Sequence, residues 1–207
     1  TARRLTDVVN RTADGAIVVD TRRAADFAVG HAPGTINIPL NASFTTWAGW
    51  VLPYTSDCYL LIDKKDSIDV AVRDLAMIGL DRVAGYLDAA ALDAWGASGR
   101  PFGTIPQIQP ADLAESLRHG GVTLVDVRNA TEWQSGHIDG ARHVPLGYLT
   151  DRIGELPKDT AIVLQCQSGA RSAIGASLLR QRGFDRVINL TGGISAWIKD
   201  GLPTVTS

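Results

Sequence analysis

The most constraining feature of the sequence is an internal repeat. Several short blocks of the first half recur in the same order in the second half, at an offset of 106 positions that falls to 104 toward the end of the repeat. The matched blocks are residues 18–22 with 124–128, 30–35 with 136–141, and 79–83 with 183–187. A repeat of this kind indicates two homologous domains. Since the segment 101–106 contains proline and glycine, as linkers often do, we predict domains at 1–103 and 104–207.

Composition excludes several classes of protein. The net charge of −2 gives no basic excess for binding nucleic acid, and no apolar run reaches the ~18 residues of a membrane span. The N-terminal residues Thr1, Ala2, Arg3 and Arg4 precede no apolar signal core, and the chain does not begin with Met, which fits an excised portion. The two cysteines lack Cys-x-x-Cys spacing, so we expect a reducing compartment, the cytoplasm.

Short apolar runs alternate with helical patterns along the chain. We expect buried strands at residues 16–19, 59–62, 122–125, 161–164 and 187–190. Helices are expected from Pro110 and over 170–182, where Gly183 ends the pattern. The alternation predicts an α/β protein in which each domain is a small, mainly parallel sheet flanked by helices on both faces. Ligands of such sheets bind at the carboxyl ends of the strands.

One cysteine lies where such a sheet would bind a ligand. The strand 161–164 leads into Cys166, and a loop of small residues containing Gly169 then joins the strand to a helix. We expect the sulfur to face backbone N–H groups and a helix N-terminus, with Arg171 adding positive charge, an environment that lowers the pKa of a thiol. The alternative, a buried inert cysteine, suits Cys58 better, because Cys58 has no such loop.

The loop from Cys166 to Arg171 resembles the active-site loop of the rhodanese family of sulfurtransferases. Further segments are similar to that family and occur in its order, namely 126–128, Glu132 with Trp133, 136–141, 144–145, and 192–194 with Trp197. The resemblance implies that Cys166 takes a sulfur atom from thiosulfate or a low-molecular-weight persulfide such as glutathione persulfide, forming a cysteine persulfide. A thiol, cyanide or sulfite would then accept the sulfur.

The same resemblance assigns roles to the loop residues. The persulfide anion would be stabilised by the backbone dipoles of Gln167, Ser168, Gly169, Ala170 and Ser172. Arg171 would hold the loop or the donor. A basic residue often follows the nucleophile in the family, so Gln167 makes a persulfide donor at least as suitable as thiosulfate.

Two interpretations remain open for the charged residues near this loop. Asp126 and Arg128 follow a strand end, and they either line the substrate crevice or form a structural ion pair that braces the loop. Glu132 has the same two alternatives, with the structural one favoured. The four histidines do not have the spacing of a metal site, and we predict neither a metal nor a cofactor within this chain. The recurrence of His31 at His137 indicates a role in a turn.

The first copy has no equivalent of the reactive loop. Aligning residues 59–63 with 162–166 places Asp63 opposite Cys166, in a loop without cysteine, glycine or a closing arginine. We therefore expect residues 1–103 to be a degenerate, non-catalytic domain. Trp47, Trp50 and Tyr54 form either a contact surface or part of its core, and we favour the core.

Several functions compete with an independent enzyme. A degenerate copy followed by an active one is also similar to the C-terminal part of fusions with a metallo-β-lactamase-fold persulfide dioxygenase, in which the chain would be a sulfur carrier or docking module. A cysteine phosphatase or arsenate reductase would need a Cys-to-Arg loop one residue longer. A purely regulatory domain would not need the intact loop at Cys166.

Overall fold

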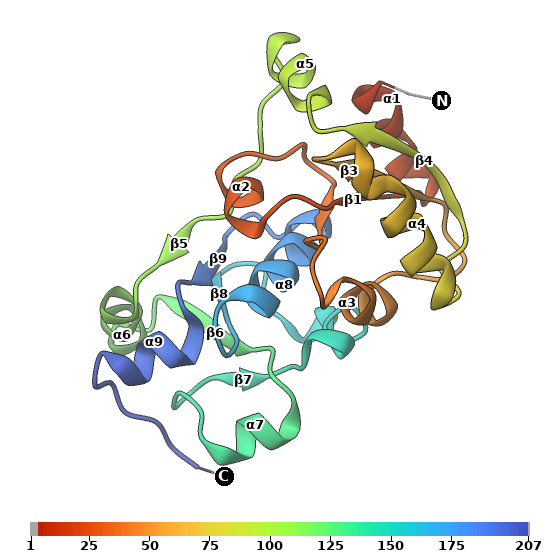
Figure 1. The fold of residues 1–207 in the computed structure, drawn as a ribbon. Helices are drawn as coiled ribbons and strands as arrows, with labels where there is room; N and C mark the ends of the chain where they lie inside the picture. The colour runs from red at the N-terminus through yellow and green to blue at the C-terminus, as the bar shows by residue number, and fades with distance from the viewer. Residues whose placement is uncertain (1–3, 207) are drawn as a thin grey trace. The chain divides into compact units, whose positions relative to one another are not determined.

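The computed structural model describes residues 4–206, so the first three residues of the N-terminal segment considered above lie outside it. The chain divides between Thr104 and Ile105 into two compact units, each with its own parallel sheet (Figure 1). Within the described residues, none of the helices combines the length and hydropathy that a membrane span requires.

The first unit is built on a four-stranded parallel sheet with the order β2-β1-β3-β4. Its strands are β1 (Ile17–Asp20), β2 (Ile36–Asn37), β3 (Cys58–Ile62) and β4 (Val83–Asp88). Its helices are α1 (Leu5–Asn10), α2 (Ala24–Val29), α3 (Phe44–Val51), α4 (Ile68–Met77) and α5 (Ala91–Ala97), with 3-10 turns η1 (Arg11–Asp14) and η2 (Lys65–Ser67).

The second unit repeats this sheet order and adds one strand, giving β5-β9-β8-β6-β7, again all parallel. Its strands are β5 (Gln107–Ile108), β6 (Val122–Asp126), β7 (Arg142–His143), β8 (Ala161–Gln165) and β9 (Val187–Leu190). Its helices are α6 (Pro110–Arg118), α7 (Ala130–Ser135), α8 (Ala170–Gln181) and α9 (Gly193–Lys199), with 3-10 turns η3 (Leu146–Tyr148) and η4 (Ile153–Glu155).

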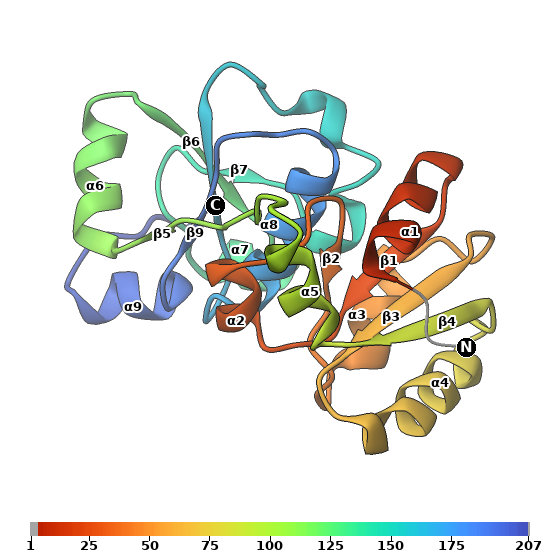
Figure 2. The ribbon, with the colours of Figure 1, turned by 90° about the horizontal axis from the view of Figure 1, so that it is seen from above.

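Helices cover both faces of the second sheet, because its strands are apolar on both sides. On one face, Val163 of β8 belongs to a buried cluster with Leu113 of α6 and Trp197 of α9, and these two helices lie beside one another (Figures 1 and 2). On the other face, α8 approaches β8 so closely that a Cβ on Gly175 would lie 3.6 Å from the Leu164 side chain. The predicted α/β class, with parallel sheets flanked by helices, is confirmed.

Each unit contains the same set of internal contacts, in addition to the same sheet order. In the first unit, the His31 ring stacks on Phe27 at 3.8 Å between ring centroids, and the Trp95 indole N–H donates to the Pro101 carbonyl. In the second unit, His137 stacks on Trp133 at 3.6 Å, and Trp197 donates to the carbonyl of Pro203. The sequence repeat is therefore a repeat of tertiary contacts, in which His31 and His137 each stack on an aromatic ring of the preceding helix. Each also forms an isolated β-bridge, to Gly103 and Val205 respectively, so their role in a turn stays a prediction.

The strand registers correct our alignment of the two copies. Asp20 lies opposite Leu61 in the first sheet, and its equivalent, Asp126, lies opposite Gln165 in the second. The residue that follows each of these partners is Ile62 and Cys166 respectively. Placing Asp63 opposite Cys166 is therefore wrong by one residue, and a buried isoleucine holds the position of the nucleophile in the first unit.

The aromatic segment of the first unit also departs from expectation. Helix α3 buries Phe44 and Ala48, which are one turn apart, and Trp47 is half-buried. Trp50 and Tyr54 are 56% and 50% exposed, so assigning them to the core is wrong. Trp50 lies on the face of α3 away from Phe44 and Ala48, and Tyr54 lies in the turn after the helix, so the size of these side chains does not bury them.

Candidate functional site

The reactive loop starts at the end of the central strand β8. Gln165 is the last residue of β8, Cys166 follows it directly, and α8 begins at Ala170 (Figure 1). Gly169 joins the loop to α8 with a φ of +94°, a left-handed conformation that favours glycine. Strand, turn and helix together hold Cys166 at the carboxyl edge of the sheet, where parallel sheets bind ligands.

Polar groups surround the sulfur of Cys166. The Gly169 amide N–H donates to Sγ with an N···S distance of 3.2 Å, and the Ser172 hydroxyl donates to it over 3.5 Å. Cys166 is 1% exposed, whereas Gln167 and Ser168 in the loop are exposed. The sulfur thus lies on the floor of the loop, against hydrogen-bond donors and below a rim that meets solvent.

The start of helix α9 holds the reactive loop in place through backbone hydrogen bonds. The Ile194 N–H donates to the Cys166 carbonyl at 2.8 Å, and the Ser195 N–H donates to the Gln167 carbonyl at 3.1 Å. The Gln167 amide also donates to the Ser195 hydroxyl at 2.8 Å. Gly193 makes this approach possible, because a Cβ there would lie 2.2 Å from the Cys166 carbonyl oxygen. Ser195 was not among the expected site residues, since a serine in a helix gives no local signal of such a contact.

Arg171, at the end of the loop, is held by an acidic residue of a different helix. Its guanidinium forms a two-point ion pair with Glu132 of α7, with N···O distances of 2.6 and 2.5 Å. The hydrogen bonds from Arg171 hold the pKa of the Glu132 carboxyl below its usual value. The pKa of the Arg171 guanidinium is raised, first by the Glu132 carboxylate and then by the nearby Cys166 sulfur. Both groups are therefore charged at neutral pH, and Arg171 is fixed beside the sulfur.

Glu132 is itself anchored at the start of α7. The Asn129 side chain accepts from the Glu132 N–H at 2.9 Å, while the Glu132 carboxylate accepts from the Asn129 N–H at 3.2 Å, which is a capping box. This local structure fixes the backbone of Glu132 and aims its carboxylate toward Arg171. The geometry favours the structural interpretation of Glu132, as a residue that positions Arg171.

Asp126 and Arg128 form a buried ion pair. Their side chains are 0% and 3% exposed, and the Arg128 guanidinium bonds both carboxylate oxygens of Asp126. Arg128 also donates to the carbonyls of Glu132 and Gly136, so it ties α7 to the end of β6. These contacts occupy both residues within the protein, which favours a brace over a wall of the substrate crevice.

Two histidines of this unit lie on the two sides of one tryptophan. Trp133 stacks with His137 at 3.6 Å and with His143 at 4.7 Å between ring centroids. A ring nitrogen of each histidine is hydrogen-bonded to a backbone carbonyl. In residues 4–206 no group of three or more His, Cys, Asp or Glu side chains is arranged to hold a metal ion.

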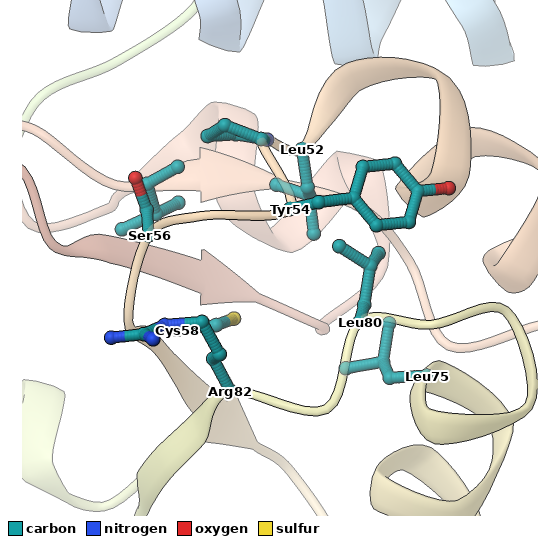
Figure 3. A pocket seen from close by; sticks show the side chains of 9 residues that line it. Leu52, Tyr54, Ser56, Cys58, Leu75, Leu80 and Arg82 are labelled. Carbon is teal, nitrogen blue, oxygen red and sulfur yellow. The ribbon is translucent and has the colours of Figure 1, made fainter.

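Cys58 has a very different environment from Cys166. It lies among Leu52, Leu75 and Leu80, around a space of only about 10 Å³ (Figure 3). Burial raises the pKa of its thiol to about 12. This is the packing residue that the sequence indicates.

Part of the chain is similar to known proteins. Residues 109–200 match the family model of the rhodanese-like domain. A sulfurtransferase of Allochromatium vinosum is 45% identical over 84 residues, which are 41% of this chain and 78% of that protein. A thiosulfate sulfurtransferase of Stutzerimonas stutzeri is 33% identical over 88 residues, covering 42% of this chain and 81% of the relative. The solved structure of a rhodanese-related protein from Thermoplasma volcanium aligns with 31% identity and a TM-score of 0.46, over 49% of this chain and 99% of that one. The chain belongs to the rhodanese-like sulfurtransferase family.

Proposed function

We propose that residues 104–207 form a catalytic domain that transfers a sulfane sulfur through a persulfide on Cys166. The observation behind this proposal is the position of Sγ, which receives hydrogen bonds from Gly169 and Ser172 at the floor of a loop braced by α9. Oriented amide and hydroxyl dipoles stabilise an anion at that point without reorganising. A persulfide anion on Cys166 is such a species.

The proposed reaction has two half-reactions. With thiosulfate, the Cys166 thiolate attacks the outer sulfur, the S–S bond of the donor breaks, and sulfite leaves with the electron pair. With a persulfide donor, the leaving group is the corresponding thiolate. In the second half-reaction a thiolate, cyanide or sulfite attacks the outer sulfur of the persulfide, and the Cys166 thiolate leaves. The order predicts ping-pong kinetics.

The loop residues divide into two groups in this mechanism. Gly169 and Ser172 supply hydrogen bonds to the sulfur, and Arg171 holds the loop with a fixed positive charge. Gln167, Ser168 and Ala170 form the exposed rim that a donor or acceptor meets first.

The rim bears on the choice of donor. Gln167 is neutral and is held by Ser195, so it presents no cation to the thiosulfate dianion. The names of two relatives, both thiosulfate sulfurtransferases, favour thiosulfate as the donor. Because Gln167 is neutral, we propose that a low-molecular-weight persulfide such as glutathione persulfide serves as a donor equally well. Both cysteines are free thiols, which suits the reducing cytoplasm.

The test is the intact mass of the protein after incubation with each donor. A gain of about 32 Da, one sulfur atom, should appear in the unaltered chain and in Cys58→Ala, and should be lost in Cys166→Ala. No adduct with any donor would refute sulfur transfer. Turnover of an aryl phosphate would revive the phosphatase alternative.

The same experiment separates an enzyme from a sulfur carrier. An adduct that forms without repeated turnover toward cyanide or a thiol would favour a carrier or docking module, including one joined to a metallo-β-lactamase-fold persulfide dioxygenase. We propose that residues 1–103 are not catalytic, because Ile62 holds the position of the nucleophile. Asp63→Ala should leave sulfur transfer unchanged.

A further inference from the structure

The first unit has an open cavity at the same edge of its sheet that holds the reactive loop in the second unit. The cavity measures about 510 Å³, within the range of small-molecule sites of ~300–1,000 Å³. Its lining comes from the ends of β1 and β3, from the start of α2 and from the segment after β2. The lining residues are Thr21, Arg22, Arg23, Asp26, Leu40, Ile62, Asp63, Lys64 and Ser67.

The ion pair that braces the loop of the second unit is replaced by a local one in the first unit. In the second unit, the acidic residue of α7 reaches the arginine of the reactive loop. In the first unit, Asp26 of α2 instead bonds Arg23, just before the same helix, at 2.8 and 3.0 Å. Asp26 therefore makes no ion pair with the segment after β3 that would correspond to the Glu132–Arg171 pair, among the residues that the structure describes.

Two of the three lining cations are already neutralised. Arg22 is paired with the buried carboxylate of Asp20 at 2.7 Å, and Arg23 is paired with Asp26. Among the side chains that the structure describes, neither Asp63 nor Lys64 has a hydrogen bond or ion pair. Asp63 and Lys64 both line this cavity and are exposed to solvent. The cavity thus offers one carboxylate and one ammonium on adjacent residues.

We propose that this cavity binds a small zwitterion, an amino acid or short peptide, whose ammonium group pairs with Asp63 and whose carboxylate pairs with Lys64. A simple anion such as thiosulfate gains from Lys64 but is repelled by Asp63, so it fits less well. The half-buried side chain of Leu40 offers an apolar surface to a short side chain of the ligand. The site is a binding site only, because an isoleucine replaces the nucleophile, and it does not depend on sulfur transfer in the second unit.

The test uses the full chain carrying Cys166→Ala, so that no sulfur chemistry interferes. S-methylglutathione, which has an ammonium group and carboxylates but no thiol, is titrated into ¹⁵N-labelled protein. Amide shifts are expected in residues 20–26 and 61–67. Asp63→Asn and Lys64→Gln should each weaken binding up to about fivefold, the value of an exposed ion pair. Asp66→Asn, a charge change on the same loop outside the cavity lining, is the matched control and should bind normally.

Three results would overturn the proposal. One is the absence of shifts in these residues up to the solubility limit of the probe. Another is equal affinity for thiosulfate or for N-acetyl-S-methylcysteine, which lacks the ammonium group and would reveal an anion site. The third is an equal effect of Asp66→Asn and Asp63→Asn. None of them bears on the mass shift at Cys166, so failure here and failure of the proposed function are distinguishable.

Discussion

Replacing Gly193 with alanine tests whether the start of α9 sets the shape of the reactive loop. The new Cβ would lie 2.2 Å from the Cys166 carbonyl oxygen and 2.8 Å from the Gln167 carbonyl carbon, far inside van der Waals contact. Both obstacles are backbone atoms, so a rotamer change cannot relieve them. The helix must move away from the loop, which breaks the hydrogen bonds from Ile194 and Ser195.

The cost can be worked out against a glycine with the same backbone requirement. Gly193 has a φ of +58° and Gly120 a φ of +69°, and alanine at either pays roughly 1–2 kcal/mol for the left-handed conformation. A Cβ on Gly120 meets nothing within 4 Å, so that variant pays this cost alone. Gly193→Ala loses in addition two hydrogen bonds of about 1 kcal/mol each, a further cost of about 2 kcal/mol.

Hydrogen exchange measures this difference at the place where it arises. We expect the Ile194 amide to exchange about thirtyfold faster in Gly193→Ala than in Gly120→Ala, since about 1.4 kcal/mol corresponds to a factor of ten. Sulfur transfer should fall about 100-fold, because a shift of ~1 Å in a reacting group costs that much. If Gly193→Ala keeps the Ile194 protection and activity of Gly120→Ala, α9 does not position the loop.

Three further predictions concern charge and titration. Arg171 lowers the pKa of the Glu132 carboxyl, so the stabilisation that the ion pair gives is complete above the ordinary glutamate pKa and is lost as the pH falls through the lowered pKa. In urea titrations at acid pH, Glu132→Gln should therefore lose less stability with falling pH than the unaltered chain. The same variant should transfer sulfur more slowly, because Arg171 loses its partner. Asp126→Asn should destabilise the second unit by about 3–5 kcal/mol in urea, because it leaves the buried Arg128 unpaired, and a loss below 1 kcal/mol would contradict a bracing role. Burial raises the pKa of the Cys58 thiol to about 12, so at pH 8 iodoacetamide should leave Cys58 unmodified in the folded protein, as peptide mapping would show.

The sequence predicts the strands well because their signal is local. Runs of branched apolar residues place β3, β6, β8 and β9 within one or two residues of their observed bounds. It misses β4, in which buried and exposed residues alternate and leave no continuous apolar run. The short strands β2, β5 and β7, of two residues each, have no periodicity to detect.

The alignment of the two copies shows where local reasoning stops. Matching letters between residues 59–63 and 162–166 is ambiguous by one position, since both strands are uniformly apolar. The partner of each strand resolves it, because Asp20 pairs with Leu61 and Asp126 with Gln165. A register is a relation between two strands, and neither strand encodes it alone.

The sequence by itself determined the repeat, because its blocks can be matched letter by letter. It also determined the α/β class and the loop that follows Cys166, because these depend on periodicity, glycine positions and residues within six places of one another. Only the tertiary structure decided that Arg171 is held by Glu132, 39 residues away, and that Ser195, 28 residues from Gln167, anchors the rim. Such contacts form when distant helices pack on a common sheet. Their strength comes from geometry and burial, which the order of residues does not specify directly.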